Sequence, residues 1–224
     1  MARPAIIVLT ALAGVVLSGV AALAAATPVT PAPGATITSA HPHFTWTLPT
    51  GESSQGLYIA RKPDVTPEGR FYDQDIVQVG VVDAADRDWT ASQPLFAGRY
   101  WWNVWSSNAG SYAVFSTPAA FTIPVALTLV GVTTKRYTSV HALDLDVRFR
   151  ANVPRPLVRL RLLRGRKIVW KASTTAENAI GVLGSARFSW KRPSQLQRGT
   201  RLKLLASISS RGLNRARMFV VRAP

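Results

Sequence analysis

Residues 98–105, GRYWWNVW, constrain the fold of this chain more than any other part of its sequence. Four of the six residues from Tyr100 to Trp105 are large aromatic residues, and the run begins with a glycine. Such runs, bounded by turn residues, are typical of β-strands. Because successive side chains of a strand point to opposite faces, half of the run is expected in a core and half on an outer surface. The predicted core half is Tyr100, Trp102 and Val104, and the predicted outer half is Trp101, Asn103 and Trp105.

The rest of residues 35–123 consists of short β-favouring runs separated by turn residues, without a sustained helical period of apolar residues. The sequence therefore predicts strands here. The expected strands lie near residues 36–38, 43–46, 57–60, 76–82, 87–90, 99–106 and 119–123. Seven short strands predict a β-sandwich.

Three stretches of this half resemble bacterial fibronectin type III domains: PHFTW at 42–46, LFAGRYWWNV at 95–104 and FSTPAAF at 115–121. The resemblance covers residues 35–123, and in that family the late strand reads approximately L-x-x-G-x-Y-x-W-x-V. It implies a sandwich in which Tyr100 forms a tyrosine corner, its hydroxyl bonding to the backbone near the preceding turn. The residues to which it gives a structural role are Phe44, Trp46, Leu95, Gly98, Tyr100, Trp102 and Val104. It implies nothing about a ligand.

The second half of the chain alternates apolar and polar residues, most clearly in HALDLDVRFR at 141–150. Alternation with a period of two predicts strands with one buried and one solvated face. The pattern recurs at 158–162, 187–191 and 201–208, and edge-strand candidates lie at 127–133, 167–173 and 217–222. These strands predict a second sandwich, which looks like an immunoglobulin-like module although it carries no diagnostic motif.

We therefore predict an all-β protein of two tandem antiparallel β-sandwiches behind an N-terminal signal peptide. The predicted parts are a signal peptide at residues 1–26, a Pro-rich linker at 27–34, a fibronectin type III-like sandwich at 35–124 and a basic immunoglobulin-like sandwich at 125–224. The chain has no cysteine, so disulfides and thiolate metal sites are excluded. Each sandwich must be held together by its own core.

The first 26 residues have the order of a secretory signal peptide. Arg3 precedes an apolar stretch from Ala5 to Leu23, and small residues follow up to Ala26. This order predicts a secreted protein, cleaved near Ala26, that is extracellular or associated with the cell surface. The competing interpretation is an uncleaved membrane anchor, because the 22 residues 5–26 are long enough to span a bilayer.

Charge divides the two predicted sandwiches. Residues 27–124 contain 5 Lys+Arg and 8 Asp+Glu, whereas residues 125–224 contain 21 and 3, a net charge of +18. Alternation places the basic residues outward, and the binding candidates are Arg148, Arg150, Arg159, Arg161, Arg201 and Lys203. A positive surface attracts anionic partners, here an anionic cell-wall polymer, a membrane surface or another protein. Nucleic acid is disfavoured because no reader motif is present. The competing interpretation is that these residues only keep the sheet faces soluble.

Trp101 and Trp105, on the predicted outer face, have three interpretations. The long segment 62–74 or the next domain covers their rings, or the rings bind a partner protein, or they stack against a sugar ring. The last interpretation lacks a matching set of carboxylates and amides.

Catalytic motifs are absent from the sequence, which contains no G-x-S-x-G, H-E-x-x-H or Walker loop. His41 and His43 have no third ligand nearby in the sequence, so neither a metal site nor a cofactor is predicted. Asp83, Asp86 and Asp88 are attributed to turns. The sequence therefore predicts a secreted, non-catalytic binding or structural module of the bacterial cell surface, whose basic second domain contacts anionic polymers. The alternatives are an ancillary carbohydrate-binding protein and an enzyme with a cleft between the domains.

Overall fold

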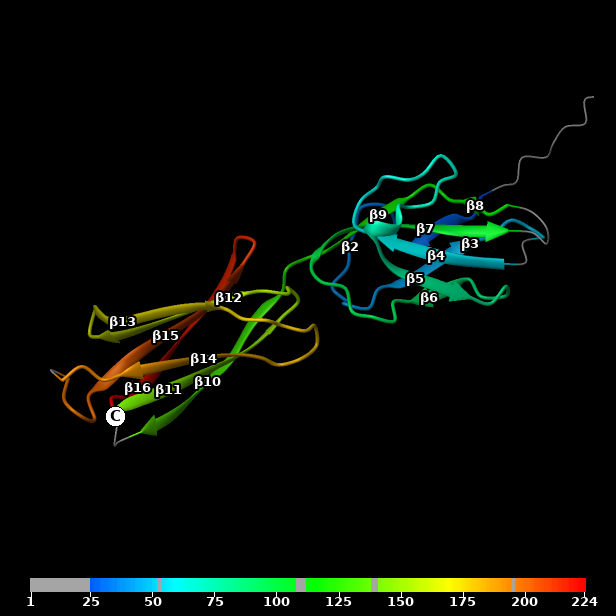
Figure 1. Ribbon diagram of the computed structural model, residues 1–224. Coiled ribbons are helices and arrows are strands. Elements are labelled where there is room, and N and C mark those ends of the chain that lie inside the picture. The colour runs from blue at the N-terminus through cyan, green and yellow to red at the C-terminus, as the bar shows by residue number, and fades with distance from the viewer. Residues whose placement is uncertain (1–24, 52–53, 108–111, 138–140, 195) are drawn as a thin grey trace, which may run out of the picture.

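The structure is a computed structural model, and it describes residues 25–51, 54–107, 112–137, 141–194 and 196–224. The described part of the chain is built from strands and one short 3-10 helix, η1, at Asp73–Asp75. Figure 1 shows two β-sandwiches that lie end to end. Apart from Ala25 and Ala26, the predicted signal peptide lies outside the described residues. Within the described ranges, no helix is long and apolar enough to cross a membrane.

The first sandwich packs a three-stranded sheet against a larger sheet. The small sheet has the order β1 (Thr27–Thr30), β3 (His43–Thr47), β6 (Asp88–Thr90). The large sheet has the order β2 (Ala35–Thr36), β9 (Ala119–Ile123), β7 (Gly98–Ser107), β4 (Ser54–Ala60), β5 (Ile76–Val82), with β8 (Val114–Phe115) beside β7. All pairings are antiparallel except that of β2 with β9.

The second sandwich repeats this arrangement. One sheet has the order β10 (Leu127–Tyr137), β11 (Ala142–Ala151), β14 (Gly184–Lys191). The other has the order β13 (Lys167–Thr175), β12 (Leu157–Arg164), β15 (Arg201–Ser210), β16 (Leu213–Arg222). Its fourth strand, β13, pairs with β12, as β5 pairs with β4 in the first sandwich. In the constant immunoglobulin arrangement, the fourth strand joins the sheet of the first, second and fifth strands. The prediction of two tandem antiparallel β-sandwiches is confirmed, and the seven strands that both sandwiches contain have the same order, while the first sandwich has β2 and β8 in addition.

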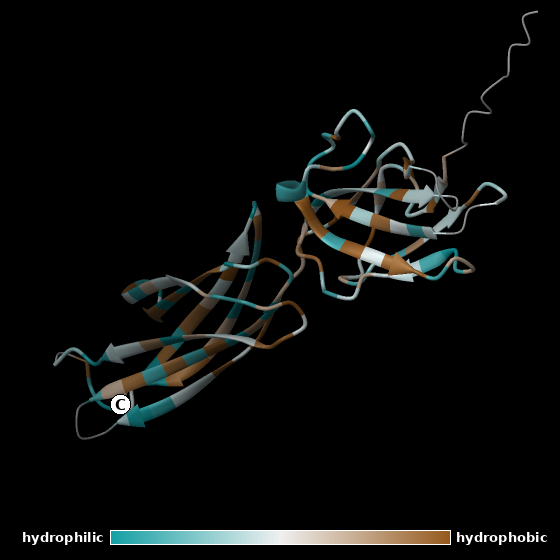
Figure 2. Cartoon of the chain, turned by 45° about the vertical axis from the view of Figure 1, so that its right-hand side comes forward, coloured by the Kyte–Doolittle hydropathy of each residue, from teal (hydrophilic) through white to brown (hydrophobic). Residues whose placement is uncertain are grey.

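Alternation along the strands builds both cores. In β11, Leu143, Leu145, Val147 and Phe149 are fully buried, and charged residues lie between them. Figure 2 shows these apolar and polar bands alternating along the strands. In β7, the buried residues include the predicted core half of the aromatic run, which packs with Phe44 and Phe121 in the first core.

Residues 27–34 were expected to form a linker, but Thr27–Thr30 form strand β1 of the first sandwich. Thr27 pairs with Thr47, and Ala26 is buried in the first core. Proline removes a backbone donor, which an edge strand tolerates because one side of it has no neighbour. β1 is such an edge, so its proline content did not prevent pairing.

The two sandwiches meet at Ala97, in the loop before β7. Ala97 is fully buried and packs into the core of the second sandwich. Its amide donates to the Asn152 carbonyl (2.7 Å), and its carbonyl accepts a bond from Arg211 (2.8 Å). The Asn152 side chain also holds the connecting segment, since its Oδ1 accepts from the Ala126 amide (2.7 Å) and its Nδ2 donates to the Pro124 carbonyl (2.8 Å). The joint is therefore held by direct hydrogen bonds.

Candidate binding surfaces

The outer face of the sheet β13-β12-β15-β16 carries six exposed cationic side chains, and we call it the basic face. Its residues are Arg159, Arg161, Lys171, Arg201, Lys203 and Arg222. Buried apolar residues alternate with them along β12 and β15, which directs the charged side chains away from the core. Lys171 pairs with Arg161 across β13 and β12, and together with Arg159 and Ser173 these residues line a shallow hollow.

The positive charge of the basic face is not compensated locally. The four strands contain no aspartate or glutamate, and none of the six cations forms an ion pair with a described residue. Neighbouring strands are about 4.8 Å apart, and alternate residues along one strand are about 6.8 Å apart. These spacings are comparable to the Debye length of about 8 Å at physiological salt. The electric fields of neighbouring cations therefore overlap, and the basic face as a whole attracts extended anions.

Arg148 and Arg150, two of the predicted binding residues, do not lie on this face. They project from β11, in the opposite sheet of the second sandwich. Two carboxylates, Asp144 and Asp146, project from the same strand, and Asp146 lies 3.6 Å from the Arg148 guanidinium. The structure thus brings together four of the predicted cations, Arg159, Arg161, Arg201 and Lys203, and separates the other two from them.

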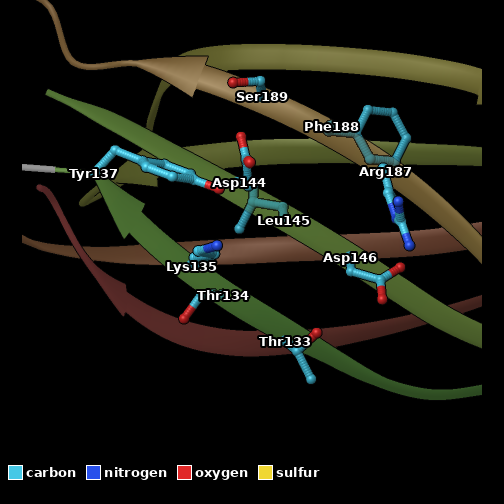
Figure 3. A pocket seen from close by; sticks show the side chains of 10 residues that line it. All are labelled: Thr133, Thr134, Lys135, Tyr137, Asp144, Leu145, Asp146, Arg187, Phe188 and Ser189. Atoms are coloured by element: carbon cyan, nitrogen blue, oxygen red, sulfur yellow. The ribbon is translucent and has the colours of Figure 1, made fainter. Parts of the chain in front are cut away.

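Figure 3 shows a larger hollow on the outer side of the sheet β10-β11-β14. Its volume is about 620 Å³, and its lining combines Lys135 and Arg187 with Asp144 and Asp146. One carboxylate oxygen of Asp146 is buried without a hydrogen-bond partner. Because both signs of charge line this hollow, it does not favour a polyanion. No pattern in the sequence marks this hollow, because it depends on the register of three strands.

The two outer tryptophans of β7 are partly buried and differ in their surroundings. The Arg99 guanidinium lies over the Trp101 ring, 5.1 Å from its centre. Trp105 lies against Gly56, the residue opposite it on β4. A Cβ atom on Gly56 would be 2.6 Å from the indole nitrogen of Trp105, so the absence of a side chain allows the ring to approach the sheet.

The segment between β4 and β5 covers part of the outer face of β7. Asn103, which was expected to be exposed, is fully buried, and its side chain donates to the Gly69 carbonyl (2.8 Å). Phe71 of the same segment is also buried, and Gly69 contacts Phe115. These contacts favour the interpretation that segment 62–74 shields this face.

Tyr100 anchors the loop that forms the joint. Its ring is fully buried, and its hydroxyl donates to the Phe96 carbonyl (2.7 Å), which is the tyrosine-corner contact. Burial raises the pKa of Tyr100, and the positive charges of Arg61 and Arg211 partly oppose this shift. The other residues with a predicted structural role that lie in the first core are Phe44, Trp46, Leu95, Trp102 and Val104.

His41 and His43 each have a hydrogen-bond partner within the first sandwich. His41 Nδ1 lies 2.8 Å from the Ala91 carbonyl oxygen, and His43 Nδ1 lies 3.0 Å from Thr90 Oγ1. Within the described ranges, no three His, Asp or Glu residues are grouped so that they could hold a metal ion. Five hollows in this part of the chain are each lined by residues of a single sandwich.

No protein-family model matches the chain, and no curated protein matches it. Solved structures with a similar fold include a tetra-tandem repeat from the extending region of a large adhesion protein, with 18% identity and a TM-score of 0.47. This likeness covers 89% of the present chain and 49% of the other, so the present chain spans about half the length of that one.

A segment of two fibronectin type III domains from chicken tenascin has 9% identity and a TM-score of 0.44, and the likeness covers 88% of this chain and 97% of that one. Fibronectin(III)-like modules of CbhA from Clostridium thermocellum have 9% identity and a TM-score of 0.30, with 88% and 92% covered. At these identities the likenesses concern the fold alone. The first sandwich is fibronectin type III-like, because it combines a tyrosine corner with a two-sheet antiparallel arrangement.

Proposed function

We propose that this protein is an exported, non-catalytic module of the cell surface that binds anionic surface polymers through the basic face of its second sandwich. The observation that carries this proposal is the clustering of six cations on one sheet that contains no carboxylate. A solubilising role alone would not require this separation, since mixed charges serve solubility equally well. The opposite sheet of the same sandwich has such a mixture.

The ligand class follows from the shape and composition of the face. A sheet presents its side chains in rows, so its cations suit an extended chain of anionic groups rather than a single small anion. Arginine binds phosphate and carboxylate groups through paired N–H donors, and both groups occur in surface polymers. The proposal therefore covers phosphate-containing and uronate-containing polymers, which linear polyphosphate and polygalacturonate represent as probes.

Two variants with equal loss of charge test the assignment to this face. The face variant carries Arg159→Gln, Arg161→Gln, Lys171→Gln and Lys203→Gln. The control variant neutralises four cations of the opposite sheet, and its substitutions are Arg148→Gln, Arg150→Gln, Arg187→Gln and Lys191→Gln. All eight residues are exposed, so both variants are expected to fold, which thermal unfolding checks.

We expect the face variant to lose most of its binding to immobilised polyphosphate and polygalacturonate at low salt, and the control variant to keep most of it. Equal losses in the two variants would show that only net charge matters and would reject the basic face as a site. Retention of full binding by the face variant would reject it as well. Binding to DNA and to vesicles with anionic lipids, measured beside the polymers, identifies a different polyanion if one of these binds more tightly.

Trp105 supports a second candidate function, binding of a sugar ring by stacking. Trp105 and Trp101 are both partly exposed, but the Trp105 ring lies against Gly56, whereas the Arg99 guanidinium lies over the Trp101 ring. This candidate predicts that Trp105→Ala abolishes retention on neutral polysaccharides while Trp101→Ala has a small effect. Absence of retention for the wild-type protein on a panel of such polysaccharides would reject it.

A further inference from the structure

Two arginines from different sandwiches converge at the joint. Arg61 follows β4 of the first sandwich, and Arg211 lies in the turn between β15 and β16 of the second. Both are exposed, and both point toward Gly98, the first residue of β7. Neither forms an ion pair with a carboxylate of the described residues.

Each arginine is held in place by the fold. The Arg61 guanidinium lies over the Tyr100 ring, 5.0 Å from its centre, and Tyr100 is itself fixed by its bond to Phe96. Arg211 uses one Nη1 hydrogen bond to the Ala97 carbonyl. It has a positive φ of 46° beside Gly212, as a tight hairpin turn requires. A guanidinium has five N–H donors, so most donors of both residues stay available.

The missing side chain of Gly98 would border both guanidinium groups. Its φ does not lie in the left-handed region, so its backbone conformation does not require glycine. A Cβ atom here would lie 3.7 Å from Arg61 Nη1 and 3.8 Å from Arg211 Nη1, which places these nitrogens at most about 7.5 Å apart. One tetrahedral oxyanion spans such a gap, because its oxygens are about 2.5 Å apart and accept N–H donors at about 2.8 Å.

We propose that Arg61 and Arg211 form a binding site for a phosphate-type or sulfate-type oxyanion above Gly98, which bridges the two sandwiches. Two like charges held close together repel each other, and a bound dianion converts this repulsion into attraction on both sides. The site is separate from the basic face, so it does not depend on the function proposed for that face. The anion is either free phosphate or a phosphate group within a polymer.

Isothermal titration of the purified protein with inorganic phosphate tests the site, at constant ionic strength with chloride as the competing anion. A second titration with a short oligo(glycerol phosphate) separates the two sources of the anion. We expect Arg61→Gln to weaken binding of the anion about tenfold or more, as expected for loss of a charge-assisted contact. Gly98→Ala should weaken it without any change in charge, because the added methyl group would contact both guanidinium groups on the side where the anion binds.

Two controls separate this site from other effects. Arg166→Gln removes one exposed charge from the turn between β12 and β13, and the face variant removes four from the basic face. Both should bind inorganic phosphate as the wild type does, and thermal unfolding should show that all variants are folded. Binding of the free anion, or of the oligomer alone, with dependence on Arg61 and Gly98 supports the proposal. No binding of either ligand, or binding that is unchanged in Arg61→Gln and Gly98→Ala, overturns it.

Discussion

Neutralising the basic face should change the salt dependence of polyanion binding as well as its strength. Each protein cation that contacts a polyanion releases condensed counterions, so the affinity falls with salt in proportion to the number of contacts. The face variant removes Arg159, Arg161, Lys171 and Lys203 from a set of six. The slope of log affinity against log salt therefore counts the cations that this surface uses.

The expected slopes follow from that count. For a flexible single-stranded polyanion the slope is about −0.7 per contact, so six contacts give about −4 and two contacts give about −1.4. Between about 50 and 200 mM NaCl, the wild-type affinity should fall about 300-fold and that of the face variant only about 7-fold. The two proteins thus differ most at low salt and converge as salt is raised.

Fluorescence anisotropy of end-labelled polyphosphate, measured across this salt range, provides both slopes. The control variant loses the same four charges from the opposite sheet, and it should keep a slope close to that of the wild type. If both variants showed the same reduced slope, the ligand would respond only to net charge, and the assignment of binding to the basic face would be refuted. A wild-type slope near zero would refute ionic recognition altogether.

Three further predictions concern the fold and the processing of the chain. Gly56→Ala should destabilise the first sandwich by about 1–3 kcal/mol in urea unfolding, because its Cβ atom would meet a backbone oxygen and an indole ring at 2.6 Å. Gly131→Ala, with no atom within 4 Å of its Cβ, should be far milder, and an equal cost would contradict the packing argument. Asn152→Ala removes two side-chain hydrogen bonds to the connecting segment and should therefore let the angle between the sandwiches vary. Spin labels on two engineered cysteines, one in each sandwich, should then show a broader distance distribution. Labelling is specific to these two sites because the chain has no cysteine of its own. An unchanged distribution would show that the joint does not depend on these bonds. Because Ala26 is buried in the first core, we expect cleavage after Ala24, two residues before the boundary expected from the sequence and also at an A-x-A pattern. N-terminal sequencing of secreted protein tests this, and a start at Thr27 would contradict it.

The strands could be predicted from sequence because each has a local signal. Alternation in β11 and the aromatic run in β7 depend only on neighbouring residues, and burial in the structure follows both except at Asn103, which segment 62–74 covers. β1 was missed because Pro28 and the prolines that follow the strand are typical of a linker, and only the position of β1 at a sheet edge makes Pro28 compatible with pairing.

The composition of the basic face could be predicted only in part, because it depends on which strands share a sheet. Arg148 and Arg159 look equivalent in the sequence, since both alternate with buried apolar residues. Their strands belong to different sheets, so they point in opposite directions. Lys171 and Arg222 were not recognised as members, because the register of an edge strand is set by its partner and is not contained in its own pattern.

Seven strands have the same order in both sandwiches, so the shared part of the fold cannot explain how their surfaces differ. The sheet that carries the basic face corresponds to the sheet β9-β7-β4-β5 of the first sandwich. There the outer face presents Val79, Val81 and Trp105 in place of the cations, and Val79 and Val81 are exposed. The equivalent surfaces thus differ: in the first module the outer face exposes apolar residues on β5 and one cation, Arg99, on β7, and in the second it carries six cations. Because the joint fixes Ala97 against Asn152, a ligand that contacts both faces must match the angle between them. The affinity for such a ligand should therefore depend on the joint as well as on the residues of either face.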